Sequence, residues 1–244
     1  MPHFFVEREN ICGEMLVIKG SDAVHIGRSL RMRLGDVITV CCEGMEYRSK
    51  ILTISDKEVE CDVLLAQPSN AEPSIKLTLF QAMPKSDKLE FIVQKAVELG
   101  VTEIRPVMTA RCISRPEGKN LSKRIERLNK IALEAAKQCG RGIVPKVCDL
   151  IGFDECVEML AACDVPLMCY EQGGINLRDA GLDKLENGQS VGLFIGSEGG
   201  FEQHEAESCR DAGVKIIGLG ERILRCETAP VAAASIIMSL TGNM

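Results

Sequence analysis

Apolar and polar positions alternate in two different ways along the chain, and the change comes near residue 70. In the first part, short β-branched and apolar runs are separated by glycine, aspartate and serine, which is typical of strands joined by tight turns. The predicted strands cover residues 15–18, 37–41, 47–54 and 59–65. They favour a small β-barrel over residues 1–70. The polar segment 67–74, which carries two prolines, predicts a linker.

In the second part, residues 74–244, apolar strand-like runs alternate with helical patterns of period 3.6. The predicted strands are 75–82, 104–108, 166–170, 190–195 and 214–219. The predicted helices are 88–99, 122–140 with Ser122 as N-cap, 153–161, 202–212 and 229–240. This alternation predicts an α/β domain with a mostly parallel sheet covered by helices on both faces.

Composition narrows the setting in which the chain works. The twelve cysteines are scattered without a C-x-x-C pair, so we expect reduced, mostly buried thiols in a cytoplasmic protein. The three histidines are too dispersed to predict a metal site. No apolar run is long enough to span a bilayer and the first residues do not resemble a signal peptide, so we expect no membrane association.

The net charge of −6 argues at first against a nucleic-acid partner. Its distribution changes that picture, because residues 105–146 contain eleven basic residues against Glu117, Glu126 and Glu134. The basic residues are Arg105, Arg111, Arg115, Lys119, Lys123, Arg124, Arg127, Lys130, Lys137, Arg141 and Lys146. Such a local excess can bind phosphate, although a solvated helix face would look the same.

Two glycine-rich segments follow predicted strands. The first strand runs into Gly196, Gly199 and Gly200, and the second ends at Gly220. Glycines at a strand's carboxyl end let the backbone approach a ligand, and adjacent strand ends share one crevice in an open α/β sheet. The spacing G-x-x-G-G is neither the dinucleotide fingerprint nor a P-loop, and taken alone it also fits an ordinary tight turn.

The segments 195–201 and 219–229 resemble the two signature segments of the ribosomal RNA small subunit methyltransferase E family, which makes 3-methyluridine in 16S rRNA. Further similar segments are 23–32, 88–101 and 138–141, so the resemblance runs nearly end to end. Ser197 departs from the family, which usually has proline there.

The resemblance implies an N-terminal PUA-like β-barrel and a C-terminal SPOUT domain, an α/β fold with a trefoil knot. It also implies a homodimer that uses S-adenosyl-L-methionine. Backbone groups would do most of the cofactor recognition. The cofactor-binding residues it implies are Tyr170, Glu171, Ile195, Gly196, Glu198, Gly199, Gly200, Leu219, Gly220, Ile223, Leu224 and Thr228.

Methylation of uracil N3 needs a base, a positive charge near the uracil oxygens and alignment with the methyl group. Arg225 is the candidate cation, and Glu227 and Glu198 are the candidate bases. Each has a structural alternative. Arg225 and Glu227 could pair with each other, Glu198 could cap the following helix, and Thr228 could be an N-cap.

Candidate RNA contacts lie mainly in the first domain, where phosphate contacts would position the substrate. The residues are Arg8, His25, Arg28, Arg31 and Arg33, with Lys85, Lys88 and the basic stretch 105–146 as second-rank candidates. Arg28 and Arg31 could equally be surface charges on one short helix. The expected substrate is 16S rRNA within the small ribosomal subunit, as the resemblance implies, and the sequence itself leaves open whether free rRNA is also a substrate.

Three other functions fit parts of the sequence. A knotted 2′-O-methyltransferase usually carries an N-x-G-x-x-x-R segment early in the catalytic domain, and this chain has none. A non-catalytic RNA-binding or assembly factor would not need both glycine-rich segments and Arg225. A nicotinamide oxidoreductase would share the α/β pattern but would need the missing fingerprint.

Overall fold

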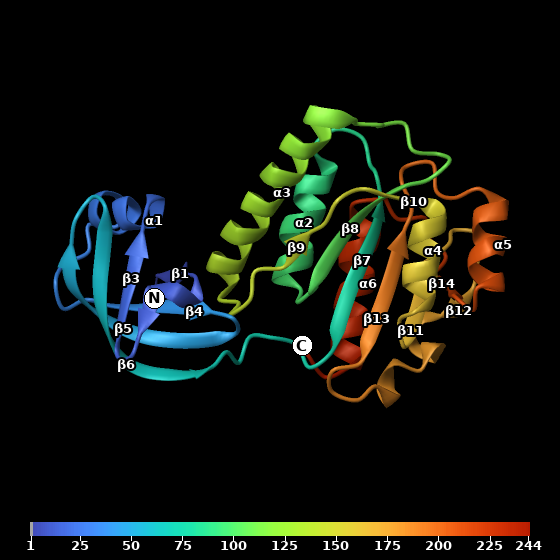
Figure 1. The fold of residues 1–244 in the computed structure, drawn as a ribbon. Coiled ribbons are helices and arrows are strands. Elements are labelled where there is room, and N and C mark those ends of the chain that lie inside the picture. Colours follow the sequence, from blue (N-terminus) through green and yellow to red (C-terminus); the bar gives the residue numbers. More distant parts are fainter. Residues whose placement is uncertain (1) are drawn as a thin grey trace. The chain divides into compact units, whose positions relative to one another are not determined.

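The computed structural model describes residues 2–244, which form two compact units (Figure 1). The first comprises the chain up to Glu72 together with Ala136–Ile143. The second comprises Pro73–Ala135 together with Val144–Met244. Within residues 2–244 no helix has the length and apolar character that crossing a membrane requires.

The first unit is a six-stranded sheet in the order β1-β4-β5-β6-β3-β2. Its strands are β1 (His3–Phe5), β2 (Ile11–Cys12), β3 (Met15–Lys19), β4 (Val37–Cys42), β5 (Met45–Ile54) and β6 (Glu58–Pro68). β1 pairs in parallel with β4, and the other pairs are antiparallel. Alternate residues such as Leu16 and Ile18 on β3 and Ile38 and Val40 on β4 point into one core. The short helix α1 (Ser21–Val24) adds Ala23 to it.

The segment 136–143 packs with the first unit through two ion pairs. Lys137 Nζ lies 2.8 Å from Asp22 Oδ1, and Arg141 Nη2 lies 2.6 Å from Glu72 Oε2. The Glu72 carboxylate also accepts hydrogen bonds from the backbone amides of Gly142 and Ile143. Because the Arg141 side chain is only 3% exposed, this pair is shielded from water.

We expect Arg141→Met to destabilise the first unit by about 3 kcal/mol, because it leaves the Glu72 carboxylate without its cation in a shielded site. Hydrogen exchange of the 136–143 segment and of β4, followed by mass spectrometry, measures the loss. Arg127→Met is the matched control, since the Arg127–Glu90 pair is largely exposed on the arginine side and is worth less than about 1 kcal/mol. Equal effects of the two changes would contradict this expectation.

The second unit is built on a parallel sheet in the order β10-β8-β7-β13-β11-β14-β12, with β9 pairing β8 outside this path. The strands are β7 (Lys76–Ala82), β8 (Glu103–Met108), β9 (Lys146–Val147), β10 (Ile151–Gly152), β11 (Val165–Cys169), β12 (Ile175–Asn176), β13 (Ser190–Ile195) and β14 (Lys215–Gly218). The helices are α2 (Lys88–Glu98), α3 (Gly118–Cys139), α4 (Phe153–Ala161), α5 (Gln203–Asp211) and α6 (Thr228–Leu240).

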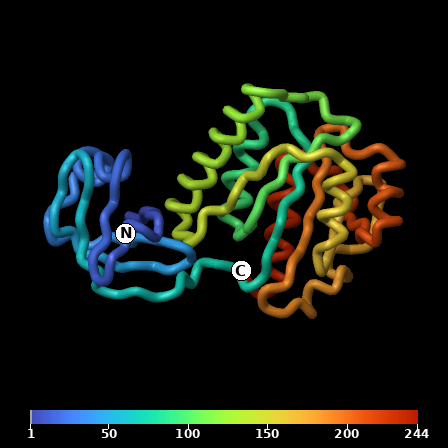
Figure 2. The backbone as a smooth tube through the Cα atoms, in the orientation of Figure 1, coloured from blue at the N-terminus to red at the C-terminus, as the bar shows by residue number. Residues whose placement is uncertain are grey.

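Helices cover both faces of this sheet, as Figures 1 and 2 show. α2 packs with α6, and α4 packs with α5. The central strands are therefore buried on both sides, and β13 carries the unbroken apolar run Val191–Ile195 expected of such a strand. Gly192 interrupts the large side chains because a Cβ there would overlap Leu160 of α4. The predicted parallel sheet with helices on both faces is confirmed.

The predicted start of α3 at Ser122 is wrong. The helix begins at Gly118, just after Pro116 and Glu117, so Ser122 lies inside the helix. Its hydroxyl donates back to the Gly118 carbonyl at 3.4 Å, a local bond that a serine inside a helix can make. Ser122 therefore bonds to the first turn of α3 from inside the helix and does not cap it.

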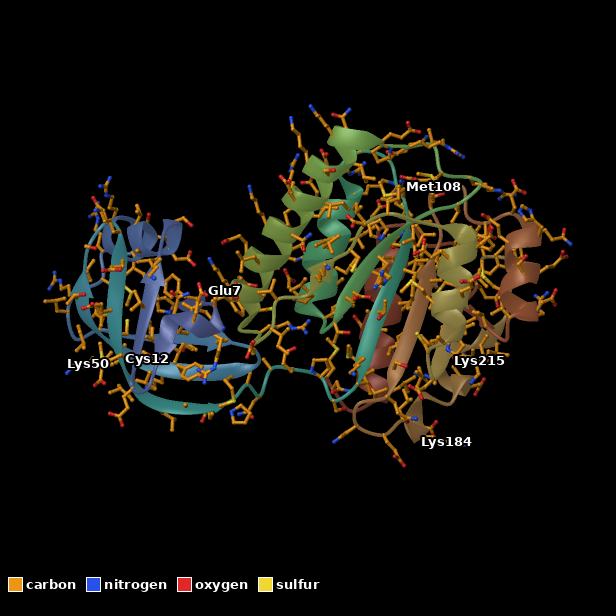
Figure 3. All side chains as sticks on the ribbon, in the orientation of Figure 1. Glu7, Cys12, Lys50, Met108, Lys184 and Lys215 are labelled. Atoms are coloured by element: carbon orange, nitrogen blue, oxygen red, sulfur yellow. The ribbon has the colours of Figure 1, made fainter. Side chains whose placement is uncertain are left out.

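All twelve cysteines are free thiols, and most are buried. Burial raises the pKa of Cys61 and of Cys209 to about 12, so both thiols stay protonated at neutral pH. Cys12, on the edge strand β2, is exposed (Figure 3). The thiols thus act mainly as small apolar side chains.

Candidate active site

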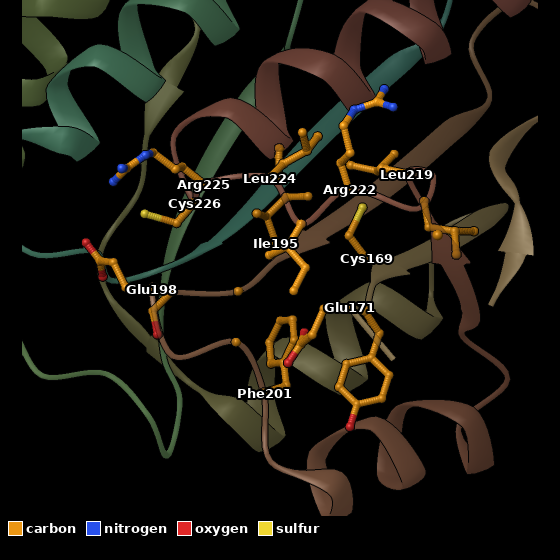
Figure 4. Close-up of a pocket in the computed structure, with 18 of the residues that line it drawn as sticks. Cys169, Glu171, Ile195, Glu198, Phe201, Leu219, Arg222, Leu224, Arg225 and Cys226 are labelled. Atoms are coloured by element: carbon orange, nitrogen blue, oxygen red, sulfur yellow. The ribbon is translucent and has the colours of Figure 1, made fainter. Parts of the chain in front are cut away.

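A pocket of about 500 Å³ lies at the carboxyl edge of the parallel sheet (Figure 4). The loops after β11, β13 and β14, three neighbouring strands, form its walls. The residues that the resemblance assigned to the cofactor and that line this pocket are Tyr170, Glu171, Ile195, Gly196, Glu198, Gly199, Gly200, Leu219, Gly220, Ile223 and Leu224. Thr228 lies outside the lining. It is the first residue of α6, whose N-cap is Glu227, so the alternative of Thr228 as N-cap is wrong.

The loop after β13 is folded tightly back on itself. Gly200 donates its amide to the Ser197 carbonyl at 3.0 Å. Gly200 has a φ of +66°, and a Cβ there would overlap the Glu171 carboxylate of the neighbouring loop. A Cβ on Gly196 would come within 3.2 Å of the Gly200 backbone. The positive φ favours glycine at position 200, and a side chain there would also displace the Glu171 carboxylate from the pocket wall.

Gln81, at the end of β7, fixes the start of this loop. Its buried side-chain amide donates to the Gly196 carbonyl at 3.2 Å and to the Ala82 carbonyl at 3.1 Å. The other side-chain atom, Oε1, has no partner among residues 2–244. The Gly196 carbonyl is thus held in one orientation by a side chain that does not itself line the pocket.

Arg111 holds the middle of the loop from the segment that follows β8. Its guanidinium donates to the Gly199 carbonyl at 2.8 Å and to both carboxylate oxygens of Glu202 at 3.0 and 3.2 Å. Glu202 is also the N-cap of α5, in a capping box with Glu205. The hydrogen bonds from Arg111 lower the pKa of the Glu202 carboxyl. Glu202, and not Glu198, therefore caps the following helix.

We expect Arg111→Met to loosen the 196–202 loop, because the Gly199 carbonyl and the Glu202 carboxylate lose their shared donor. Hydrogen exchange of the Gly199–Glu202 amides should become several-fold faster while that of β13 stays unchanged. Arg105→Met serves as the control, since Arg105 and Glu103 pair with each other on β8, the strand before the Arg111 segment. Unchanged exchange in the loop of the Arg111 variant would show that the guanidinium does not hold it.

One end of the pocket is charged. Glu198, Arg225 and Cys226 lie together on one side, and Cys169, Leu219 and Arg222 lie on the other (Figure 4). Lys88, the first residue of α2, joins the charged side. Its Nζ lies 3.0 Å from Glu198 Oε1 and 3.1 Å from Glu227 Oε2.

These contacts set the charge states of the cluster. Hydrogen bonds that Lys88 donates to Glu198 and Glu227 raise its pKa, so it remains an ammonium ion. Partial burial works to raise the pKa of Glu198 and of Glu227, but hydrogen bonds from backbone amides and from Lys88 outweigh it, and both pKa values lie below the ordinary one. Burial raises the pKa of Cys226 to about 12. At neutral pH Lys88 therefore carries a positive charge, Glu198 and Glu227 carry negative charges, and the Cys226 thiol is neutral, with the Arg225 guanidinium as a second cation beside them.

The structure brings the three residues that sequence reasoning assigned to catalysis to one end of the pocket, but it gives them different environments. Glu198 lines the pocket, and Arg225 lines it with an exposed side chain. Glu227 lies just outside the lining, bonded to Lys88. The alternative in which Arg225 pairs with Glu227 is wrong, because within residues 2–244 the ion-pair partner of Glu227 is Lys88.

The sequence-predicted RNA contacts divide between the units. All five in the first unit are exposed, namely Arg8, His25, Arg28, Arg31 and Arg33. Arg28 is in the helical turn His25–Ser29 and pairs with Asp56. Arg31 lies beyond that turn with a φ of +52°, so the expectation of one helix carrying both arginines is wrong. In the second unit Lys85 is exposed, while Lys88 belongs to the pocket.

Sequence reasoning missed several residues that build the pocket. Gln81 is on β7 and Arg111 is in the segment after β8, neither of which supplies a signature segment, so only their positions at the carboxyl ends of strands could have suggested them. Phe201 closes the loop from beneath, packed edge-on against Phe194 at a centroid distance of 4.7 Å. Lys88 was predicted as a second-rank RNA contact, and only the structure places it in the lining of the pocket.

Comparison with known proteins covers both units. The sequence matches the RNA methyltransferase domain family over residues 71–238 and the RNA methyltransferase PUA domain family over residues 18–64. It is 37% identical to ribosomal RNA small subunit methyltransferase E of Bacillus subtilis (strain 168), over 90% of this chain and 88% of that protein.

Solved structures agree with the sequence matches. Ribosomal RNA small subunit methyltransferase E from Neisseria gonorrhoeae, solved bound to S-adenosyl methionine, superposes with a TM-score of 0.87 at 29% identity over 98% of each chain. A Legionella pneumophila protein solved with the same cofactor gives a TM-score of 0.86 at 28% identity, over 97% of this chain and 96% of that one. With sequence and structure matching over nearly their whole length, the chain belongs to the ribosomal RNA small subunit methyltransferase E family.

Proposed function

We propose that the protein uses S-adenosyl-L-methionine to methylate N3 of a specific uridine in 16S rRNA of the small ribosomal subunit. The observation that carries this proposal is the pocket at the carboxyl edge of the sheet, which joins a backbone-lined, glycine-rich wall to a charged end. Its sequence segments are those of a family whose relatives are named for action on small-subunit ribosomal RNA.

The residues present fit this cofactor. Glu171 offers carboxylate oxygens beside Gly200, as a ribose needs, and Ile195 and Leu219 offer apolar surface for an adenine ring. The glycines leave main-chain groups accessible at the same edge. When bound, the cofactor supplies an activated methyl group on a sulfonium. A pocket of about 500 Å³ is within the range of small-molecule sites.

The charged end suits the uracil. N3 carries a proton, and its lone pair is withdrawn by two flanking carbonyls, so methyl transfer requires proton removal and stabilisation of the resulting anion. Arg225, Glu198 and Glu227 are the candidates from the sequence. Glu198 is the better base of the two acids on position, because it lines the pocket and Glu227 does not.

We propose that the domain over residues 1–70 binds RNA and that residues 74–244 form the methyltransferase domain. Exposure of Arg8, Arg28 and Arg33 supports the first role, since phosphate contacts need accessible cations. We further propose, on the family resemblance, that the second domain carries a trefoil knot, works as a homodimer and acts in the cytoplasm.

Purified protein incubated with methyl-labelled S-adenosyl-L-methionine and small-subunit particles lacking 3-methyluridine tests the proposal. Mass spectrometry of the digested rRNA should detect 3-methyluridine at one position. Free 16S rRNA in a parallel reaction identifies the preferred form of the substrate. Label recovered on a ribose 2′-oxygen or on another base would overturn the proposed product.

A further inference from the structure

Lys88 occupies a position that its sequence neighbourhood does not explain. It starts α2, yet its ammonium group contacts side chains from the loop after β13 and from the segment before α6. Of its three N–H donors, two have carboxylate partners, and the third has the weakly accepting Cys226 sulfur at 3.6 Å. A stronger acceptor that enters the pocket can replace the thiol without breaking either ion pair.

Glu198, in contrast, is held firmly and still has accepting capacity. The backbone amide of Lys85 donates to its Oε1 at 3.1 Å and more weakly to Oε2 at 3.3 Å, and Lys88 donates to Oε1. A carboxylate can accept about four hydrogen bonds, so Oε2 retains free lone pairs. The pocket therefore presents a donor and an acceptor held side by side by the ion pair between Lys88 Nζ and Glu198 Oε1, which are 3.0 Å apart.

We propose that Lys88 and Glu198 together read the N3–H/O4 edge of the target uracil, with Lys88 donating to O4 and Glu198 accepting the N3 proton. This inference rests on the proposed function and deepens it by naming a further catalytic residue. It moves Lys88 from the RNA backbone to the base, and it transfers the anion-stabilising role from the exposed Arg225 to a cation held by two carboxylates.

The pair selects uracil by the order of its donor and acceptor. Uracil presents a donor at N3 beside an acceptor at O4, which complements a carboxylate beside an ammonium. Cytosine presents the reverse, an acceptor at N3 beside an amino donor at N4. In this pocket cytosine would place its N3 lone pair against Glu198 and its amino group against Lys88, two repulsive contacts that together exclude it.

The same pair accounts for the proton and the charge during transfer. The N3 proton passes to Glu198, the N3 electron pair forms the new N–CH₃ bond, and the electron pair of the broken C–S bond remains on sulfur, which becomes a neutral thioether. Lys88 stabilises the negative charge that grows on O4 and loses no proton. Glu227 acts through Lys88 as the second counter-ion that keeps the ammonium charged in a partly buried site.

Lys88→Met tests the inference, with Lys95→Met as the matched control, because Lys95 is on the same helix and its ion-pair partner among residues 2–244 is Glu98. Each variant is assayed on small-subunit particles that carry uridine and on particles whose rRNA carries 5-fluorouridine. Fluorine withdraws electrons and makes the N3 proton more acidic, so this substrate needs less stabilisation of its anion. Affinity for S-adenosylhomocysteine is measured by calorimetry.

We expect Lys88→Met to lower kcat on uridine by about 10²–10³-fold, the usual cost of losing one anion-stabilising donor. The loss should shrink at least tenfold on 5-fluorouridine, in line with the smaller charge to be stabilised. The Kd for S-adenosylhomocysteine should stay unchanged, and Lys88→Arg should recover part of the rate.

Three results would overturn the inference while leaving the proposed function intact. They are full activity of Lys88→Met, an equal loss on both substrates, and a loss of S-adenosylhomocysteine affinity that accounts for the loss of rate. The last would place Lys88 at the methionine end of the cofactor. If the wild-type protein makes no 3-methyluridine, the proposed function fails and the inference fails with it.

Discussion

Gly200→Ala should abolish cofactor binding, with an increase of at least about 100-fold in the Kd for S-adenosylhomocysteine, equivalent to about 3 kcal/mol. Gly200 has a φ of +66°, where an L-residue is strained, and a methyl group there would overlap the Glu171 carboxylate. The loop can relieve the overlap only by displacing Glu171 or by opening the Ser197–Gly200 turn. Either movement changes the wall of the pocket.

Gly188→Ala is the matched control for this change. Gly188 also has a positive φ, +88°, and it precedes β13, but a Cβ there meets no atom within 4 Å. The control therefore carries the backbone strain without the steric overlap, and its Kd should equal that of the wild-type protein. Isothermal titration calorimetry on both variants separates the two effects. Comparable losses of affinity would mean that general destabilisation of the domain, and not a change in the wall of the pocket, weakens cofactor binding.

Glu198→Gln should lower kcat by about 10²–10⁴-fold, the range for loss of a positioned general base. The glutamine side-chain oxygen can still accept the hydrogen bond from the Lys85 backbone amide, so the loop should keep its shape. The group that accepts the N3 proton is lost. Glu227→Gln should cost much less, because Glu227 lies outside the pocket lining and acts through Lys88. Single-turnover methylation of small-subunit particles measures both.

The pH dependence of the wild-type rate adds a second test of Glu198. Because the pKa of its carboxyl lies below the ordinary value, the group is already deprotonated at neutral pH. Between about pH 6 and pH 8 the rate should therefore stay constant, because the carboxylate that takes the N3 proton is already ionised throughout this range. A step in the rate near neutral pH, or a larger loss for Glu227→Gln than for Glu198→Gln, would show that Glu198 is not the base.

The long elements of the fold follow from local patterns, and the short ones do not. The strand 190–195 and the helix 153–161 were predicted to the residue, because an unbroken apolar run and a clear 3.6-residue period are local signals. β9, β10 and β12 have two residues each, too few for any period to appear. The segment 136–143 belongs to the first unit through contacts between residues far apart in the sequence, such as the Glu72–Arg141 pair.

The candidate site shows the same division. The glycine-rich segments predict the pocket because glycines close together in the sequence indicate a backbone that needs a positive φ or a close approach. The partners of Lys88 cannot be found in the same way, because Glu198 and Glu227 come from distant segments that only the folded sheet brings to the start of α2. Arg111 was likewise seen as one of a run of basic residues, although its task is to hold Gly199 and Glu202.

The most direct test of the central claim is mass spectrometry of nucleosides from small-subunit rRNA of cells that lack this gene. The cells are compared with and without complementation by the intact protein and by Arg225→Ala. The account predicts that 3-methyluridine disappears with the gene and returns with the intact protein, and that Arg225→Ala restores it at least partly if Lys88 carries the anion-stabilising charge. Persistence of 3-methyluridine with loss of a different methylated nucleoside would contradict the assigned product.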